Sequence, residues 1–242
     1  MPIFGNHDNE SKKGVTWQCE IFENSPYCLF KRNNLTGNGN YNIGLFVNNK
    51  LKRVIYMIDS NGCWFAYNYG YVKEYPPYNQ NEKVQIINGI YQDQVAWIEK
   101  TSNKINNIYG NVNKFICTHI APSFVNEQAI KNKYQKDNEE LFVLGETVTP
   151  INGDFGVKGE RFPLIPCYNL LEILKKCNFD GMFVAHSHNN SLSILCDDFS
   201  RVTFTLKTSI SDYHKWHGGT VVTLKDNNFG VEHLYIDSFD VK

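Results

Sequence analysis

The feature that most constrains the fold is a pair of short apolar runs, each preceded by a segment with helical periodicity. The runs lie at residues 114–118 and 181–185, and the amphipathic segments at residues 90–103 and 168–177. Short, mostly apolar runs are typical of strands buried inside a sheet, with helices packed against it. Later in the chain only strand patterns remain. The sequence therefore predicts an α/β fold with a β-rich C-terminal part.

Turn signals and further patterns complete this prediction. Residues 41–47 and 52–59 are β-rich runs joined by Asn48-Asn49-Lys50, which favours a hairpin. A short helix is predicted over residues 16–23, and irregular loops over 68–83 and 126–163. We interpret the whole chain, residues 1–242, as a single domain.

Composition excludes several classes of function. The net charge of −1 gives no electrostatic footprint for nucleic acid or for a membrane surface, and no apolar run is long enough to span a bilayer. The seven cysteines form no CxxC pair, which argues against a structural zinc site. An odd cysteine count and no secretory signal favour reduced thiols and a cytoplasmic location. A local disulfide between Cys19 and Cys28 is the alternative.

Three segments share one layout, in which an apolar strand ends at a His or an Asn. They are residues 5–8 (GNHD), His119, and the His-x-His pair at residues 186–188. Because ligands gather at the carboxyl ends of strands in α/β sheets, these loops are candidates to converge. Imidazole nitrogen and amide oxygen bind borderline divalent metals. Taken singly, each signal also fits an ordinary loop histidine, whereas all three in this order are far less expected by chance.

These segments resemble the third, fourth and fifth signature motifs of the calcineurin-like metallophosphoesterase superfamily. The Gln94-x-x-Trp97 pair also resembles this family, in which such a helix commonly precedes the fourth motif. Residues 26–29, 39–41 and 59–60 are similar to a branch of small purple-acid-phosphatase-like enzymes. The resemblance covers essentially the whole chain, and it implies a two-sheet α/β sandwich.

The resemblance also implies a set of metal ligands. Asn6, His119 and His186 would ligate one metal ion, and His188 would ligate a second. The ions implied are Fe, Mn or Zn, and ligand type alone does not choose among them.

The implied reaction is hydrolysis of a phosphate ester, on a protein or a small molecule, by metal-activated water. His7 would face the substrate as a proton donor or phosphate-orienting group, held by a carboxylate such as Asp8. The predicted partner is thus a phosphorylated substrate, with no nucleic acid and no membrane.

The sequence departs from the family at its start. The first two family motifs, Asp-x-His and Gly-Asp-x-x-Asp, would precede residue 5, where only four residues stand. We therefore expect an N-terminally truncated form with impaired activity and fewer than two bound ions, since a bridging carboxylate would be missing. Neither residues 212–214 (DYH) nor residues 153–156 (GDFG) replace these motifs. Ala185 stands where the family usually has Gly.

Two rival interpretations come from other classes of protein. One is a catalytically inactive remnant that acts as a binding or oligomerisation module, forming a homo-oligomer through an exposed sheet edge. The other is a small zinc-binding protein without hydrolytic activity.

Overall fold

A computed structural model describes most of the predicted core of the chain. The described residues are 1–8, 13–61, 89–125, 167–186, 188, 193–196, 199–209, 217–225 and 228–236. The loops predicted over residues 68–83 and 126–163 lie outside them, as do the segments 153–156 and 212–214.

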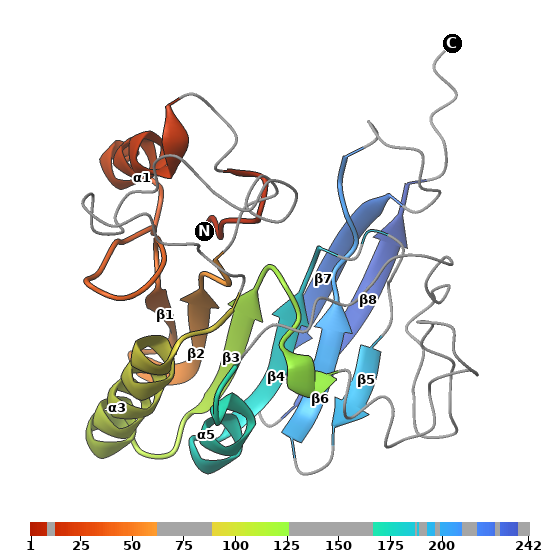
Figure 1. The fold of residues 1–242 in the computed structure, drawn as a ribbon. Coiled ribbons are helices and arrows are strands. Elements are labelled where there is room, and N and C mark those ends of the chain that lie inside the picture. Colours follow the sequence, from red (N-terminus) through yellow and green to blue (C-terminus); the bar gives the residue numbers. More distant parts are fainter. Residues whose placement is uncertain are drawn as a thin grey trace.

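The described part of the chain is built on a six-stranded mixed sheet, in the order β1-β2-β3-β4-β6-β5 (Figure 1). The strands are β1 (Tyr41–Val47), β2 (Lys50–Ile58), β3 (Asn113–Thr118), β4 (Phe179–Val184), β5 (Ser193–Cys196) and β6 (Phe199–Phe204). The four inner strands β2, β3, β4 and β6 run parallel, whereas β1 and β5 pair antiparallel at the two edges. The carboxyl ends of the inner strands therefore lie along one side of the sheet.

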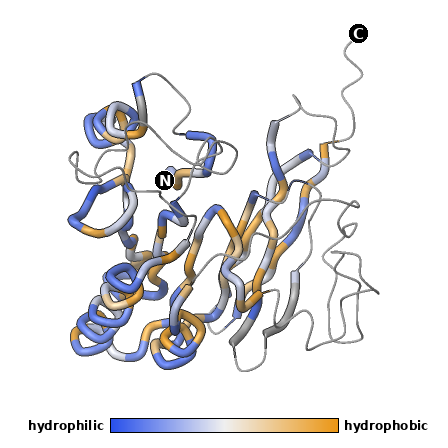
Figure 2. The backbone as a smooth tube through the Cα atoms, in the orientation of Figure 1, coloured by the Kyte–Doolittle hydropathy of each residue, from blue (hydrophilic) through white to orange (hydrophobic). Residues whose placement is uncertain are grey.

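Two helices cover one face of this sheet: α3 (Gln92–Tyr109) and α5 (Leu170–Lys176). Alternate residues of β2, including Tyr56 and Ile58, point into the main core with Ile98 of α3 and Leu174 of α5. The helix α3 ends at Gly110, whose φ of 82° suits glycine. Figure 2 shows hydrophobic residues running along the central strands, as burial between layers requires.

The opposite face of the sheet carries two smaller units. The helix α1 (Gly14–Asn24) and residues 1–8 build a second core, which includes Phe4, Phe30, Tyr41 and Met57. The strands β7 (Gly218–Leu224) and β8 (Phe229–Tyr235) pair antiparallel as a two-stranded sheet. Phe229 of this small sheet packs against Phe115 and Phe183, with ring centroids 4.9 and 6.1 Å apart.

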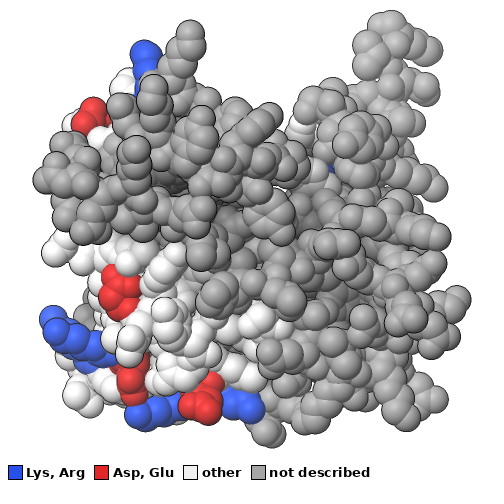
Figure 3. Space-filling model, viewed as in Figure 1, with Lys and Arg blue, Asp and Glu red and all other residues white. Residues whose placement is uncertain are grey.

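The charged side chains described on the face seen in Figure 3 are of both signs. An ion pair joins Lys176 of α5 to Glu99 of α3, at 2.5 Å. Surface pairs of this kind contribute little to stability. No described helix is long and apolar enough to cross a membrane.

The predicted α/β fold with a β-rich C-terminal part is confirmed, and so is the hairpin. Asn48 and Asn49 take φ values of 50° and 61°, the left-handed geometry of a tight two-residue turn. One prediction was wrong: the apolar residues 2–4, before the GNHD segment, were expected to end a strand, but they belong to no strand of the described chain. The alternative disulfide is absent too, since Cys19 and Cys28 are both free thiols.

Candidate metal centre

The site is assembled where neighbouring parallel strands end. Ile58 of β2 is level with Thr118 of β3, and Cys117 of β3 is level with Phe183 of β4. The next residues of β3 and β4 are therefore side by side, and the amide of Ala185 donates to the carbonyl of His119 at 2.9 Å. This register places His119 and His186 at the same side of the sheet.

Three side chains meet at this point: Asn6, His119 and His186. Asn6 Oδ1 lies 3.0 Å from His119 Nε2 and 3.1 Å from His186 Nδ1, and the two ring nitrogens are 3.3 Å apart. The rings meet edge to face, with centroids 5.2 Å apart. The three donor atoms thus form a nearly equilateral triangle, which we call the Asn-His-His triad.

The dimensions of the triad fit a single metal ion. With metal–ligand bonds of about 2.1 Å, neighbouring ligands lie about 3.0 Å apart in an octahedron and about 3.4 Å apart in a tetrahedron. All three edges of the triad fall in that interval. Within the described residues no three His, Cys, Asp or Glu side chains gather in a metal-binding group. The triad contains two such side chains, and its third donor is the amide oxygen of Asn6. Two imidazoles and an amide suit Fe, Mn or Zn.

Hydrogen bonding alone is a weaker account of the triad. The Asn6 carbonyl can accept a proton from each imidazole, which explains two of the three contacts. If both ring N–H groups point at Asn6, the two nitrogens face one another at 3.3 Å without a proton between them. A cation above the plane of the triangle satisfies all three lone pairs at once.

The backbone is adapted to this close approach at two positions. A Cβ atom on Gly5 would lie 2.9 Å from His119 Cε1 and Nε2, so only glycine lets the ring pack there. His186 has a φ of 65°, a left-handed conformation that costs a non-glycine residue free energy. Backbone strain of this kind concentrates at functional sites.

Electrostatics keep the imidazole of His119 neutral. Burial lowers the pKa of His119 to about 3, and the positive charges of His186, His188 and His7 add to this effect. At neutral pH its Nε2 therefore has a lone pair available to a metal, unless the ring adopts the tautomer protonated there.

His7 and His188 lie near the triad but are not part of it. Both are exposed, yet close enough for their charge to lower the pKa of His119. Asp8, expected to hold His7, accepts the Gly5 amide proton at 2.6 Å and closes the turn over residues 5–8. Burial raises the pKa of the Asp8 carboxyl, while the Gly5 bond and the charge of His7 lower it.

A buried polar network supports the site from the end of β2. The carboxylate of Asp59 accepts the amide protons of Asn38 at 2.6 Å and Asn61 at 2.8 Å. Burial raises the pKa of Asp59 to about 6. Gln94 of α3 donates to Asn40 Oδ1 and to the Asp59 carbonyl, both at 2.7 Å. The Gln-x-x-Trp helix is thereby fixed to the strand end next to His119.

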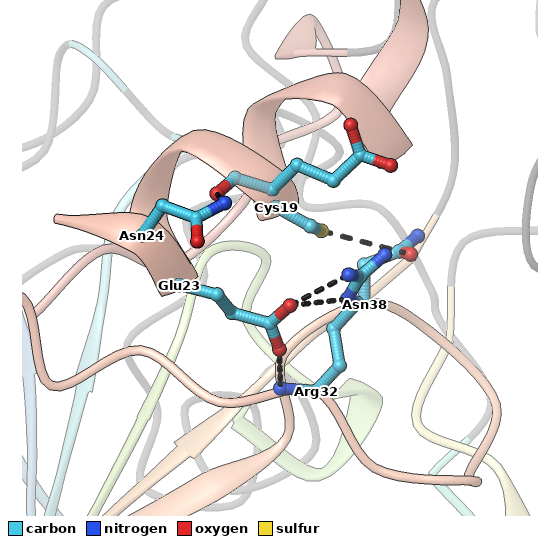
Figure 4. A network of polar contacts seen from close by, with 6 residues as sticks. Cys19, Glu23, Asn24, Arg32 and Asn38 are labelled. Atoms are coloured by element: carbon cyan, nitrogen blue, oxygen red, sulfur yellow. Dashed lines mark hydrogen bonds and ion pairs between the residues drawn. The ribbon is translucent and has the colours of Figure 1, made fainter.

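The helix α1 is tied into the same network (Figure 4). Arg32 donates to Glu23 through its side chain at 2.6 and 3.0 Å, and Cys19 lies 4.0 Å from Asn38 Oδ1. Gln18, the residue before Cys19, donates to the Asp8 carbonyl at 2.6 Å through its side-chain amide. The turn that carries Asn6 is thus fixed relative to Asp59.

Of the six side chains predicted for the site, the structure brings Asn6, His119 and His186 into direct contact. It places His7 and His188 beside them and gives Asp8 a backbone partner. Sequence reasoning gave no role in the site to Ser60, whose hydroxyl binds the backbone next to His119. A serine directly after a buried strand was the available signal.

Comparison of the chain with protein-family models, curated proteins and solved structures finds no match.

Proposed function

We propose that this protein is a metal-dependent phosphoesterase that hydrolyses phosphate esters of proteins or small molecules. The observation that carries the proposal is the Asn-His-His triad, in which three donor atoms from distant parts of the sequence lie 3.0–3.3 Å apart. The resemblance of these loops to calcineurin-like motifs supports the same conclusion. The small β7–β8 sheet, packed on the main sheet, is compatible with the two-sheet sandwich of that family.

The charge of the donors favours an anionic substrate. His119 and Asn6 are neutral at pH 7, because the pKa of His119 lies far below that pH and an amide does not ionise. An imidazole that binds a metal ion does so in its neutral form, so none of the three ligands would bring a negative charge. A divalent or trivalent ion held by them keeps most of its positive charge, which attracts a phosphate ester. When bound, an Fe, Mn or Zn ion would polarise the phosphoryl group and lower the pKa of a water molecule.

The remaining side chains position the substrate and move protons. His7 is exposed at the edge of the triad, so it is placed to donate a proton to the leaving group or to bind a phosphate oxygen. Asp8 holds the turn that presents both Asn6 and His7 through its bond to the Gly5 amide. His188 is a second exposed imidazole beside the site and a candidate ligand of a further ion.

The test is turnover of p-nitrophenyl phosphate by the 242-residue chain with Mn²⁺, Zn²⁺ or Fe²⁺ added. We expect activity that a chelator removes and the metal restores. His186→Ala should lower the rate by about a thousandfold or more, since loss of a metal ligand removes the source of activated water. His217→Ala is the matched control, because His217 Nδ1 binds the Ser209 carbonyl instead of the triad.

Two outcomes would contradict the proposal. Equal rates for the wild type and His186→Ala would show that the triad does not carry the reaction. One bound ion per chain without turnover of any phosphate ester would instead favour a metal-binding protein without hydrolytic activity. Elemental analysis gives the stoichiometry, and we expect one ion because the described donor atoms form one triangle.

A further inference from the structure

We propose that Ser60 is a positioning residue of the metal centre: it holds the peptide unit between His119 and Ile120 and so sets the His119 imidazole in the triad. The inference rests on the proposed function, which it deepens by adding a residue that contacts neither the ion nor the substrate.

The peptide unit in question is held from both sides. Its carbonyl, that of His119, accepts the Ala185 amide proton at 2.9 Å from the end of β4. Its N–H group, that of Ile120, donates to Ser60 Oγ at 3.1 Å at the end of β2. Two bonds in opposite directions fix the plane of this peptide and with it the ψ angle of His119.

Ser60 is itself firmly anchored. It is 1% exposed, and its carbonyl accepts the Gly89 amide proton at 2.8 Å. The carboxylate of the preceding residue, Asp59, accepts the amide protons of Asn38 and Asn61. The hydroxyl that binds Ile120 therefore projects from a backbone that cannot easily move.

The imidazole of His119 has little freedom once this peptide is fixed. On one side the ring packs against Gly5, so closely that a Cβ there would lie 2.9 Å away. The backbone that carries the ring is held as well, because the His119 carbonyl accepts the amide proton of Ala185, the residue before His186. A metal site tolerates displacements of only about 0.5 Å, so a rotation of the peptide separates the donor atoms beyond a useful distance.

The plain alternative is that Ser60 only satisfies a buried N–H group, in which case its loss would lower stability and nothing else. Ser102 separates the two explanations. It is fully buried in α3 and bonds the Tyr56 hydroxyl at 2.9 Å, in the core on the helical face of the sheet. Ser102→Ala removes a comparable buried bond remote from the triad.

The experiment measures Zn²⁺ affinity by calorimetry and thermal unfolding for the wild type, Ser60→Ala, Ser60→Thr and Ser102→Ala. Zn²⁺ binding that remains in His119→Ala is counted as binding outside the triad. We expect Ser60→Ala to weaken Zn²⁺ binding at the triad by about tenfold or more, the effect of losing an orienting partner. Ser102→Ala should bind within about twofold of the wild type, at a similar loss of melting temperature. Ser60→Thr keeps the acceptor oxygen and should bind more tightly than Ser60→Ala.

Equal Zn²⁺ affinity in Ser60→Ala and Ser102→Ala would overturn the role of Ser60 while leaving the proposed function intact. If the wild type binds none of Zn²⁺, Mn²⁺ and Fe²⁺ at the triad, the proposed function fails, and the positioning role is judged on the metal-free protein. There, the ring resonances of His119 in NMR spectra should shift or broaden in Ser60→Ala but not in Ser102→Ala. Unchanged resonances in Ser60→Ala would overturn the inference by themselves.

Discussion

At the scale of single residues, the backbone of His186 is the clearest sign that the candidate metal centre is maintained at a cost in stability. A φ of 65° brings the β-carbon of an ordinary L-residue too close to its own carbonyl oxygen, at a cost of about 1–2 kcal/mol. Asn48, Asn49 and Asn178 adopt the same conformation, but asparagine tolerates it. Tyr168 also takes a positive φ, of 47°, but His186 is the residue of this group whose side chain contacts Asn6 and His119.

This strain can be measured by comparing glycine with alanine at two positions. We expect His186→Gly to be more stable than His186→Ala by about 1 kcal/mol, because glycine adopts positive φ without penalty. At His119, which has no positive φ, the order should be reversed, with His119→Gly less stable than His119→Ala. Urea unfolding of the four variants gives the comparison. A His186→Ala variant at least as stable as His186→Gly would show that His186 is not strained.

At the scale of helices and strands, local patterns in the sequence predicted most elements to within a few residues. The segment 90–103 became α3, and the runs at 114–118 and 181–185 became β3 and β4, because apolar periodicity and bounding Gly or Asn residues are local signals. The register of β2 on β3 and of β3 on β4 is set by packing between residues far apart in sequence. For that reason the contact of Ser60 with Ile120 was not predictable, nor was the burial of Lys114.

Lys114 is a structural link between the elements that precede β3 and β4. It is 0% exposed, and its Nζ donates to Asn106 Oδ1, the Val112 carbonyl and the Cys177 carbonyl at 2.8, 2.6 and 2.9 Å. Burial lowers the pKa of this amine, and the charges of Cys177 and Asp180 partly offset the effect. The three bonds join the last turn of α3 to the end of α5.

Replacing this lysine should therefore be costly. We expect Lys114→Met to lower the free energy of unfolding by about 3 kcal/mol, because three buried acceptors lose a charged donor. Lys104→Met is the control: Lys104 is an exposed residue of α3, and its replacement should change stability by no more than about 0.5 kcal/mol. Equal effects in a urea titration would contradict the structural role of Lys114.

At the scale of the whole molecule, the six-stranded sheet is covered differently on its two faces. Helices α3 and α5 cover one face, while the other is shared between α1 and the β7–β8 sheet (Figure 1). An isolated two-stranded sheet is at best marginally stable in water, so β7 and β8 depend on packing against the larger sheet. Phe229 supplies much of that packing, and Gly181 makes room for it: a Cβ there would lie 2.8 Å from Phe229 Cζ.

We expect Phe229→Ala to lower the free energy of unfolding by about 3 kcal/mol, because the ring fills the space between Phe115 and Phe183. Phe46→Ala should cost less than about 1 kcal/mol, since Phe46 is 54% exposed on the edge strand β1. Calorimetric unfolding tests both variants. A loss in Phe229→Ala no larger than the small loss expected for Phe46→Ala would mean that the small sheet is not held by Phe229.

The triad has a further consequence for how the chain reaches its native state. Its contacts join residues 67, 113 and 180 positions apart in the sequence. Contacts that close such long stretches of chain carry a large entropic cost, so the triad can form only once the strands that carry it are paired. The unfolded chain then has no preformed site for an ion, and an ion that binds the native triad as proposed would shift the folding equilibrium towards the native state. The supply of metal would in this way determine how long a molecule stays folded before it next unfolds.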